Sequence, residues 1–566
     1  MGLPVNTRDE YGSDYEFLPG TVHLVDVDGA LNVKKSENGD VILHPQPSSN
    51  VNDPLRWSKK KRSFQFGLVW FWAFMLATSI NFAGPLYPTW VREWNTTFGM
   101  MGVSTALGFL FLGVGVCFIQ PTGLKLGKQF CYNVCTLIII VGCIMGAFSK
   151  NIGYFLAFKV LAGISAAPVD TLVEITSTDL FFQHERTSAF SSLILALYAG
   201  SFLGPVATGY IAGTIGWKWC YYIQIIIYVP LLVAQIFLME DTTFKRAENE
   251  EEALEEGIME QIKSIRSGEQ QQRQQQPADS PEMKEFGDVE VASDSSSSQL
   301  SQTPYTWLQK RNWVHSEQGE ERSWFCIFIR PVFMIPLPAV VWGGLVYGFQ
   351  MCWLSLIVNT QARIYGSPPY NFSVESVGLT NVSVFVGNVF GMFYGGQFVD
   401  WFTVQMARRN KGILEPEHRL HAMLVPTLIN AAGILAYGLG SYYQAHWAVS
   451  VIIGQGFMGF AMSSSGAICL VYPVECYEKL TSEALVLMLF MRNMISVGFN
   501  FGITPWITSQ GLKGATWVMF GLSLAINGSY LVFTFWGKDI RRLTKPWYGK
   551  ISDPLFGEFL RQKKRK

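Results

Sequence analysis

Two acidic side chains interrupt an otherwise apolar stretch of the sequence, GISAAPVDTLVEITSTDLFF, at residues 163–182. Asp170 and Glu174 are spaced i, i+4, which places them on one face of a helix with Cβ atoms about 5–6 Å apart. An acid near the centre of a membrane span costs roughly 2.5–3.5 kcal/mol unless it faces a cavity or a partner. If this helix crosses a membrane, the pair therefore predicts a polar cavity that binds a cation or exchanges protons.

The alternative is that each carboxylate only neutralises a buried base and holds the helices together. Lys159 lies about two to three helical turns from Asp170 and is a poor partner, whereas Arg492 falls near the middle of another apolar stretch. Pro168 removes one backbone hydrogen bond and should kink the helix beside the acids. We expect Lys159 and Arg492 to be gating or structural charges, and an ion pair to Arg492 stays open as the simpler explanation.

The chain as a whole has the composition of a membrane protein. Of its 566 residues 49% are hydrophobic and 15% are charged, and the mean hydropathy is +0.21. Apolar runs near the bilayer-crossing length of about 20 residues predict an all-α membrane protein with twelve transmembrane helices. They fall at 65–87, 101–122, 131–149, 153–178, 188–213, 217–239, 331–358, 375–399, 420–441, 446–470, 483–507 and 515–536.

The spans divide six and six around a polar linker. We expect an N-terminal tail at 1–62, a six-helix bundle at 63–239, the linker at 240–330, a second six-helix bundle at 331–537 and a basic C-terminal tail at 538–566. The linker contains GEQQQRQQQPADSP and SDSSSSQLSQ, and such low complexity cannot bury a core. It is expected to be largely disordered, and its serines leave regulation by phosphorylation open.

Charge placement predicts the orientation. The clusters KKKR, ARRNK and RQKKRK all fall on the side of the termini and the linker, so the positive-inside rule makes that side cytoplasmic. The first 62 residues show no cleavable signal peptide. The sequons at Asn95 and Asn371 then lie outside, which allows a glycoprotein, although matches at Asn381 and Asn527 inside spans show that chance also produces the pattern. A plasma-membrane location is expected, with an internal membrane as the alternative.

Cysteine and histidine give no support for a metal, a cofactor or an enzyme. The nine cysteines show no paired CxxC spacing, and the seven histidines lie in tails, loops or span ends. No nucleophile and base occur together within the spans. A proton relay inside the membrane must therefore use carboxylates.

Several motifs resemble those of the major facilitator superfamily. PTGLKLGKQ at 121–129 and GGQFVDWFTVQMARRNKGILEPEHRL at 395–420 are similar to its two loop motifs. The first copy lacks the usual acid, and the second offers Asp400 and Arg408 to latch helix ends. KVLAGISAA at 159–167 is similar to RxxQGxGAA, with Lys159 in place of the arginine, and GSFLGPVATGY at 200–210 resembles the motif of drug:proton antiporters. DPLRWSKKKR and YPVECYEKLTSEALV resemble the fungal branch that includes a yeast histidinol and polyamine permease.

This resemblance implies two six-helix bundles that rock about a site near the membrane midplane. Spans 1, 4, 7 and 10 would line the site, so that Asp170 and Glu174 are joined by candidates on the other three. An ammonium group could lie over an aromatic ring there, and ordinary packing is the alternative for each of these side chains. The further substrate-binding candidates are Asn81, Phe82, Tyr347, Gln350, Trp353 and Gln455.

The sequence thus predicts a secondary active transporter that takes up putrescine, spermidine, spermine or related cations such as histidinol with protons. Asp170 or Glu174 would bind the cation when charged and release it for a proton, because burial favours the neutral carboxyl group and a bound cation favours the charged one. A proton-driven exporter of cationic drugs and a nutrient receptor without transport are the alternatives. The expected partners are the organic cation, protons and the lipid bilayer; we expect a monomer and no nucleic acid.

Overall fold

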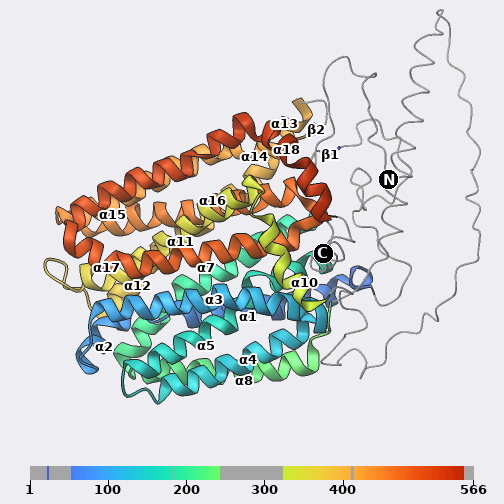
Figure 1. Ribbon diagram of the computed structural model, residues 1–566. Coiled ribbons are helices and arrows are strands. Elements are labelled where there is room, and N and C mark those ends of the chain that lie inside the picture. Colours follow the sequence, from blue (N-terminus) through green and yellow to red (C-terminus); the bar gives the residue numbers. More distant parts are fainter. Residues whose placement is uncertain (1–21, 24–52, 182, 243–322, 410–412, 553–566) are drawn as a thin grey trace, which may run out of the picture.

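The computed structural model describes residues 22–23, 53–181, 183–242, 323–409 and 413–552 (Figure 1). Most of the expected N-terminal tail, linker and C-terminal end lie outside this part of the chain. The described residues are nearly all helical, and the one sheet is a short antiparallel pair of β1 (Val22–His23) and β2 (Ile413–Leu414).

The described part of the first half contains eight helices and two short 3₁₀ turns. They are η1 (Pro54–Arg56), α1 (Lys59–Asn81), η2 (Gly84–Leu86), α2 (Tyr87–Glu93), α3 (Phe98–Leu126), α4 (Lys128–Ala147), α5 (Ile152–Asp170), α6 (Leu172–Leu180), α7 (Gln183–Thr214) and α8 (Lys218–Leu238).

The second half starts with a short helix and then repeats the pattern of long helices. Its elements are α10 (Trp324–Ile329), η4 (Arg330–Met334), α11 (Pro338–Tyr365), α12 (Val374–Phe393), η5 (Tyr394–Phe398), α13 (Val399–Arg409), α14 (Glu417–Leu420), η6 (His421–Met423), α15 (Leu424–Tyr442), η7 (Val449–Gln455), α16 (Gly456–Cys476), η8 (Glu478–Leu480), α17 (Thr481–Gly528) and α18 (Tyr530–Ser552).

The helix starts follow the sequence directly. Ser58, Thr97, Asn151 and Ser373 each stand one residue before a long helix, and the side-chain oxygen of each accepts a backbone N–H of the first turn at 3.4 Å. Such residues satisfy donors that have no partner within the helix. Polar capping residues therefore fix where four of the apolar spans begin.

Eleven helical stretches of the described chain are long and apolar enough to cross a membrane. The last of them, Thr481–Ser552, has 72 residues and crosses twice, because Gly511 interrupts α17 with φ 75° and ψ 159°, a backbone conformation that favours glycine. Arg330 contacts both ends of this stretch: it forms an ion pair with Glu483 at 2.7 Å and donates to the carbonyl oxygen of Ile551 at 3.0 Å. The all-α membrane fold predicted from the sequence is confirmed.

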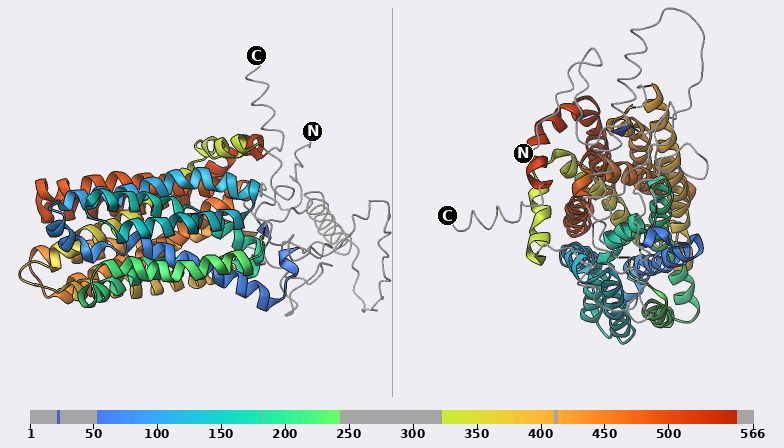
Figure 2. Two further views of the ribbon diagram at one scale, coloured as in Figure 1. Left: turned by 90° about the horizontal axis from the view of Figure 1, so that it is seen from below. Right: turned by 90° about the vertical axis from the view of Figure 1, so that its right-hand side faces the viewer.

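The long helices lie side by side along one direction (Figures 1 and 2). We call the end where α8 stops and α10 begins the linker end, at the right of Figure 1, and the opposite end the loop end. Figure 2 shows α10 and the last turns of α18 together at the linker end. Small residues allow close crossings: a Cβ atom on Gly163 of α5 would lie only 2.4 Å from the carbonyl oxygen of Gly108 in α3.

The two halves approach each other closely towards the loop end. A Cβ atom on Gly209 of α7 would lie 3.0 Å from the carbonyl oxygen of Val374, at the start of α12. A Cβ atom on Gly102 of α3 would lie 3.3 Å from the carbonyl oxygen of Asn500 in α17. The two halves are therefore in close contact at this end, and the space between them is closed there.

Candidate functional site

The segment that carries the two acids is broken rather than continuous. Helix α5 ends at Asp170, Thr171 has the non-helical angles φ −128° and ψ −60°, and α6 begins at Leu172. The break lies three residues after Pro168, which itself remains inside α5. Asp170 is thus the last residue of one helix and Glu174 lies in the first turn of the next, where an acid is favoured by the helix dipole.

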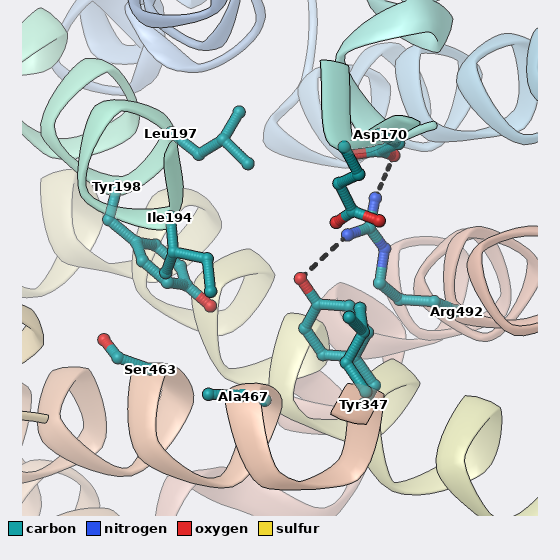
Figure 3. Close-up of a pocket in the computed structure, with 11 residues that line it drawn as sticks. Asp170, Ile194, Leu197, Tyr198, Tyr347, Ser463, Ala467 and Arg492 are labelled. Atoms are coloured by element: carbon teal, nitrogen blue, oxygen red, sulfur yellow. Dashed lines mark hydrogen bonds and ion pairs between the residues drawn. The ribbon is translucent and has the colours of Figure 1, made fainter. Parts of the chain in front are cut away.

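Both carboxylates nevertheless line one cavity between the two halves (Figure 3). The cavity measures about 20 Å³, room for roughly one water molecule. Helix α17 contributes Arg492 and α11 contributes Tyr347. The rest of the wall comes from α7 and α16, namely Ile194, Leu197, Tyr198, Ser463, Gly466, Ala467 and Leu470.

Asp170 forms an ion pair with Arg492, and this contact joins the first half to the second. The same guanidinium donates to the hydroxyl oxygen of Tyr347 at 3.1 Å, and its central carbon lies 4.9 Å from the centre of that ring. Both charged side chains are buried, with exposed fractions of 6% and 8%. Asp170 therefore has the simpler role that the sequence left open, which is to pair with a buried base.

Glu174 is placed differently. Its Oε2 atom is buried and accepts no hydrogen bond within the described part of the chain. Lys159, the other basic candidate, donates instead to the carbonyl oxygen of Ile80 at 2.5 Å and lies 5.5 Å from the ring of Phe155. Glu174 is thus a carboxylate at the wall of a cavity whose Oε2 atom has no hydrogen-bond partner among the described residues.

Two of the candidates on α11 lie away from this cavity. Gln350 donates to Asn527 Oδ1 at 2.6 Å, and Trp353 packs edge-on against Phe499 with ring centres 6.3 Å apart. Only Tyr347 of the three reaches the cavity wall. Gln350 and Trp353 lie further along α11 towards the loop end, where the halves are packed shut, so their side chains are part of the core.

The candidates at the C-terminal end of α1 and on η7 are also packed elsewhere. Asn81 donates to Ser201 Oγ at 3.1 Å, and Phe82 lies edge-on to Tyr221 with ring centres 5.2 Å apart. Gln455 donates weakly to the hydroxyl oxygen of a buried tyrosine at 3.5 Å. In this conformation none of these three side chains is part of the cavity wall.

The loop motifs form ion pairs at the linker end with partners that the sequence did not indicate. Asp400 pairs with Arg419 at 2.7 Å, and Arg419 also contacts Glu475 at 2.9 Å. The side chain of Arg408, the other residue expected to latch helix ends, lies outside the described residues. In the first half, where the motif lacks its acid, Lys128 pairs with Asp179.

Sequence reasoning also missed the wall from α7, and on the tenth span it selected Gln455 in place of the α16 residues that line the cavity. Tyr198 lies opposite the acids, and its hydroxyl group donates to the carbonyl oxygen of Met462 at 3.3 Å. The run SSSG at 463–466 is a polar, small-residue patch inside an apolar span, and Ser463 and Gly466 both line the cavity. Such a patch is a usable signal, because small and hydroxyl residues mark close helix contacts in membranes.

A match to a known family identifies the class of protein to which this chain belongs. The model of the Major Facilitator Superfamily matches residues 69–476, more than half of the chain. The chain belongs to this superfamily. It is therefore a multi-pass membrane transporter and not an enzyme, and the resemblance inferred from its motifs is confirmed.

Fungal members of the superfamily are similar over almost the full length. The protein HOL1 of Saccharomyces cerevisiae is 29% identical over 94% of this chain and 97% of its own length. An uncharacterized MFS-type transporter of Schizosaccharomyces pombe, C1271.10c, is also 29% identical, over 94% of each chain. The MFS-type transporter penM of Penicillium rubens is 24% identical over 95% of this chain and 96% of its own length.

Solved structures share the fold at low sequence identity. The proton:xylose symporter XylE is 12% identical with a TM-score of 0.56, covering 85% of this chain and 96% of its own. The human organic anion transporter MFSD10 is 12% identical with a TM-score of 0.54, covering 84% of this chain and 100% of its own. At this identity the likeness supports the fold alone.

Proposed function

We propose that the protein takes up polyamines such as putrescine, spermidine and spermine, and related organic cations such as histidinol, together with protons. The observation that carries this proposal is the cavity between the halves, which holds the two carboxylates of Asp170 and Glu174 but only one cationic side chain, Arg492. A buried site with an excess of negative charge favours a positively charged ligand, because desolvated charges must be compensated.

Polyamines suit the remaining walls of this cavity. Ile194, Leu197 and Leu470 provide apolar contacts for methylene groups, and the rings of Tyr347 and Tyr198 provide aromatic faces for an ammonium group. The motifs that resemble the fungal histidinol and polyamine branch point in the same direction. Proton binding to one of the two carboxylates, in the same crossing as the cation, then supplies the coupling.

The cavity is too small for a polyamine in the conformation described, which fits a closed stage of alternating access. Rocking of the two halves about the cavity would open one end and then the other. We propose that the linker end faces the cytoplasm, that both termini are cytoplasmic, and that the membrane is the plasma membrane. Asn95 and Asn371 are exposed between helices at the loop end and would then be accessible to glycosylation. The other two sequon residues, Asn381 and Asn527, are buried.

Uptake of radiolabelled spermidine tests this function directly. Cells that lack their own polyamine permeases should show saturable uptake when they express the protein, and the rate should rise as the external medium is made more acidic. The reason is that an inward proton gradient drives a symporter forward. Empty cells are the control, and unlabelled histidinol and putrescine added in excess report on related substrates.

The same assay separates the alternatives. Uptake no greater than in empty cells, with faster loss of a preloaded cationic drug, would make the protein an exporter. Uptake and efflux both equal to those of empty cells would leave a receptor without transport as the better proposal.

A further inference from the structure

The side chains that line the cavity include more acidic than basic groups. Asp170 of α5 and Glu174 of α6 are acidic, Arg492 of α17 is basic, and Tyr347 of α11 and Tyr198 of α7 are the other titratable groups in the wall. The α16 part of the wall contributes only serine, glycine, alanine and leucine. With both carboxylates ionised, two negative charges meet one positive charge, and one negative charge is left over.

We propose that Glu174 alone binds the transported proton, and that Asp170 serves to hold Arg492. This inference rests on the proposed function. It gives different roles to the two acids, which the sequence did not distinguish. Glu174 then takes up and releases the transported proton, while the ion pair of Asp170 with Arg492 stays intact. With Glu174 protonated, the remaining carboxylate and the guanidinium balance each other in the buried cavity.

The contacts of Arg492 support this division. Its guanidinium is held from one side by Asp170 and from the other by the hydroxyl oxygen and ring of Tyr347. To bind a substrate through Asp170, the protein would have to leave a buried guanidinium without its carboxylate, and breaking a buried pair in this way is strongly unfavourable. The carboxylate of Asp170 is therefore already paired with Arg492 and is not available to bind a substrate cation.

Glu174 is held less firmly, although the charge of Arg492 also acts on it. Its Oε2 atom is buried without a hydrogen-bond partner among the described residues, and an unpaired buried carboxylate is stabilised either by a proton or by a cation. The break at Thr171 also places it on a different helix from Asp170. Its side chain can therefore change partner without disturbing the ion pair that connects the two halves.

Four charge variants distinguish the roles in the spermidine uptake assay. Glu174→Gln should lose proton-dependent uptake. Asp170→Asn and Arg492→Gln should each lose uptake or surface expression, because each leaves a buried charge unpaired. The double variant Asp170→Asn/Arg492→Gln removes both members of the pair and keeps Glu174, so it should recover uptake that still rises with external acidity.

Glu93→Gln is the matched control, because Glu93 is exposed at the loop end and accepts a hydrogen bond from Trp217 at 2.9 Å that glutamine can also accept. Its uptake should equal that of the wild type. The division of roles is wrong if Glu174→Gln retains the wild-type dependence on pH. It is equally wrong if the double variant reaches the membrane but loses the response to pH.

A chemical readout keeps this test separate from the choice of substrate. Dicyclohexylcarbodiimide modifies protonated carboxyl groups in apolar surroundings, so purified wild-type protein should be labelled at Glu174 and not at Asp170 when its peptides are mapped by mass spectrometry. Spermidine should protect the site. Labelling of Glu174 without spermidine uptake or protection would overturn the proposed substrate but keep the proton-exchanging group, whereas labelling of Asp170 in place of Glu174 would overturn the division itself.

Discussion

A disulfide between residues 102 and 504 should stop transport completely, and reduction should restore it. Gly102 lies on α3 of the first half and Thr504 on α17 of the second, near the loop end. A Cβ atom on Gly102 would lie 3.7 Å from Thr504 Oγ1. The Oγ1 atom stands where the sulfur of a cysteine at 504 could lie, so the double variant Gly102→Cys/Thr504→Cys brings two thiols next to each other. Alternating access requires these helices to separate, and a covalent bond prevents it.

The measurement is spermidine uptake before oxidation, after copper phenanthroline treatment and after dithiothreitol. The single variants Gly102→Cys and Thr504→Cys, treated in the same way, are the controls for the native cysteines of the chain. They should remain active throughout. Peptide mapping shows whether the oxidised double variant has formed the cross-link. If it has, and the variant still transports as fast as it does after dithiothreitol, then the loop end does not open during transport.

Replacing Arg541 by glutamine should be the most destabilising change at the linker end. Arg541 of α18 donates to both carboxylate oxygens of Glu417 in α14, at 2.8 and 2.7 Å, and the exposed fractions of the two side chains are 1% and 8%. Removing one member leaves the other charge buried without its counterion, which typically costs about 3–5 kcal/mol. The melting temperature of Arg541→Gln, purified in detergent, should fall well below that of the wild type.

The neighbouring residue provides a matched control. Arg542 pairs with Asp539 at 3.8 Å, and the exposed fractions of these side chains are 52% and 70%. Such exposed pairs contribute about 0–1 kcal/mol, so Arg542→Gln should melt close to the wild type. Equal melting temperatures for the two variants would mean that the bond between α14 and α18 does not stabilise the fold.

The sequence predicts the apolar part of each helix well but not where the helices end. The first span is predicted from residue 65 and the last to residue 536, whereas α1 begins at Lys59 and α18 continues to Ser552. Hydropathy detects only the part of a helix that lies in the hydrocarbon layer. The polar turns of α18 are instead stabilised by docking, for example through Tyr477, whose hydroxyl lies 3.0 Å from Thr544 Oγ1.

The site could be predicted in part for a related reason. Asp170 and Glu174 stand out because a charge in an apolar span is costly, and Arg492 stands out in the same way. Which charge pairs with which depends on how distant helices pack, and spacing along one helix contains no information about that. The helix break at Thr171 could not be predicted either, because Pro168 indicates a kink nearby but does not fix the residue at which the helix stops.

The uncharged wall of the cavity was the least predictable part. Tyr347 was found because the family resemblance placed its span at the cavity, but the same reasoning also selected Gln350 and Trp353, which lie in the core. Hydroxyl and amide side chains are costly to bury only if they lack a partner. Gln350 finds one in Asn527, and no pattern in the sequence reveals such a bond.

Internal pH in proteoliposomes is the most direct test of proton-coupled cation uptake by this cavity. Purified protein is reconstituted with a pH-sensitive dye inside, and spermidine is added outside with no initial pH difference. We predict that the interior becomes acidic, because a symporter carries protons inward with the cation, and that Glu174→Gln abolishes the signal while Glu93→Gln keeps it. An interior that becomes alkaline would indicate exchange of spermidine for protons, and an unchanged pH with wild-type protein would contradict proton-coupled uptake.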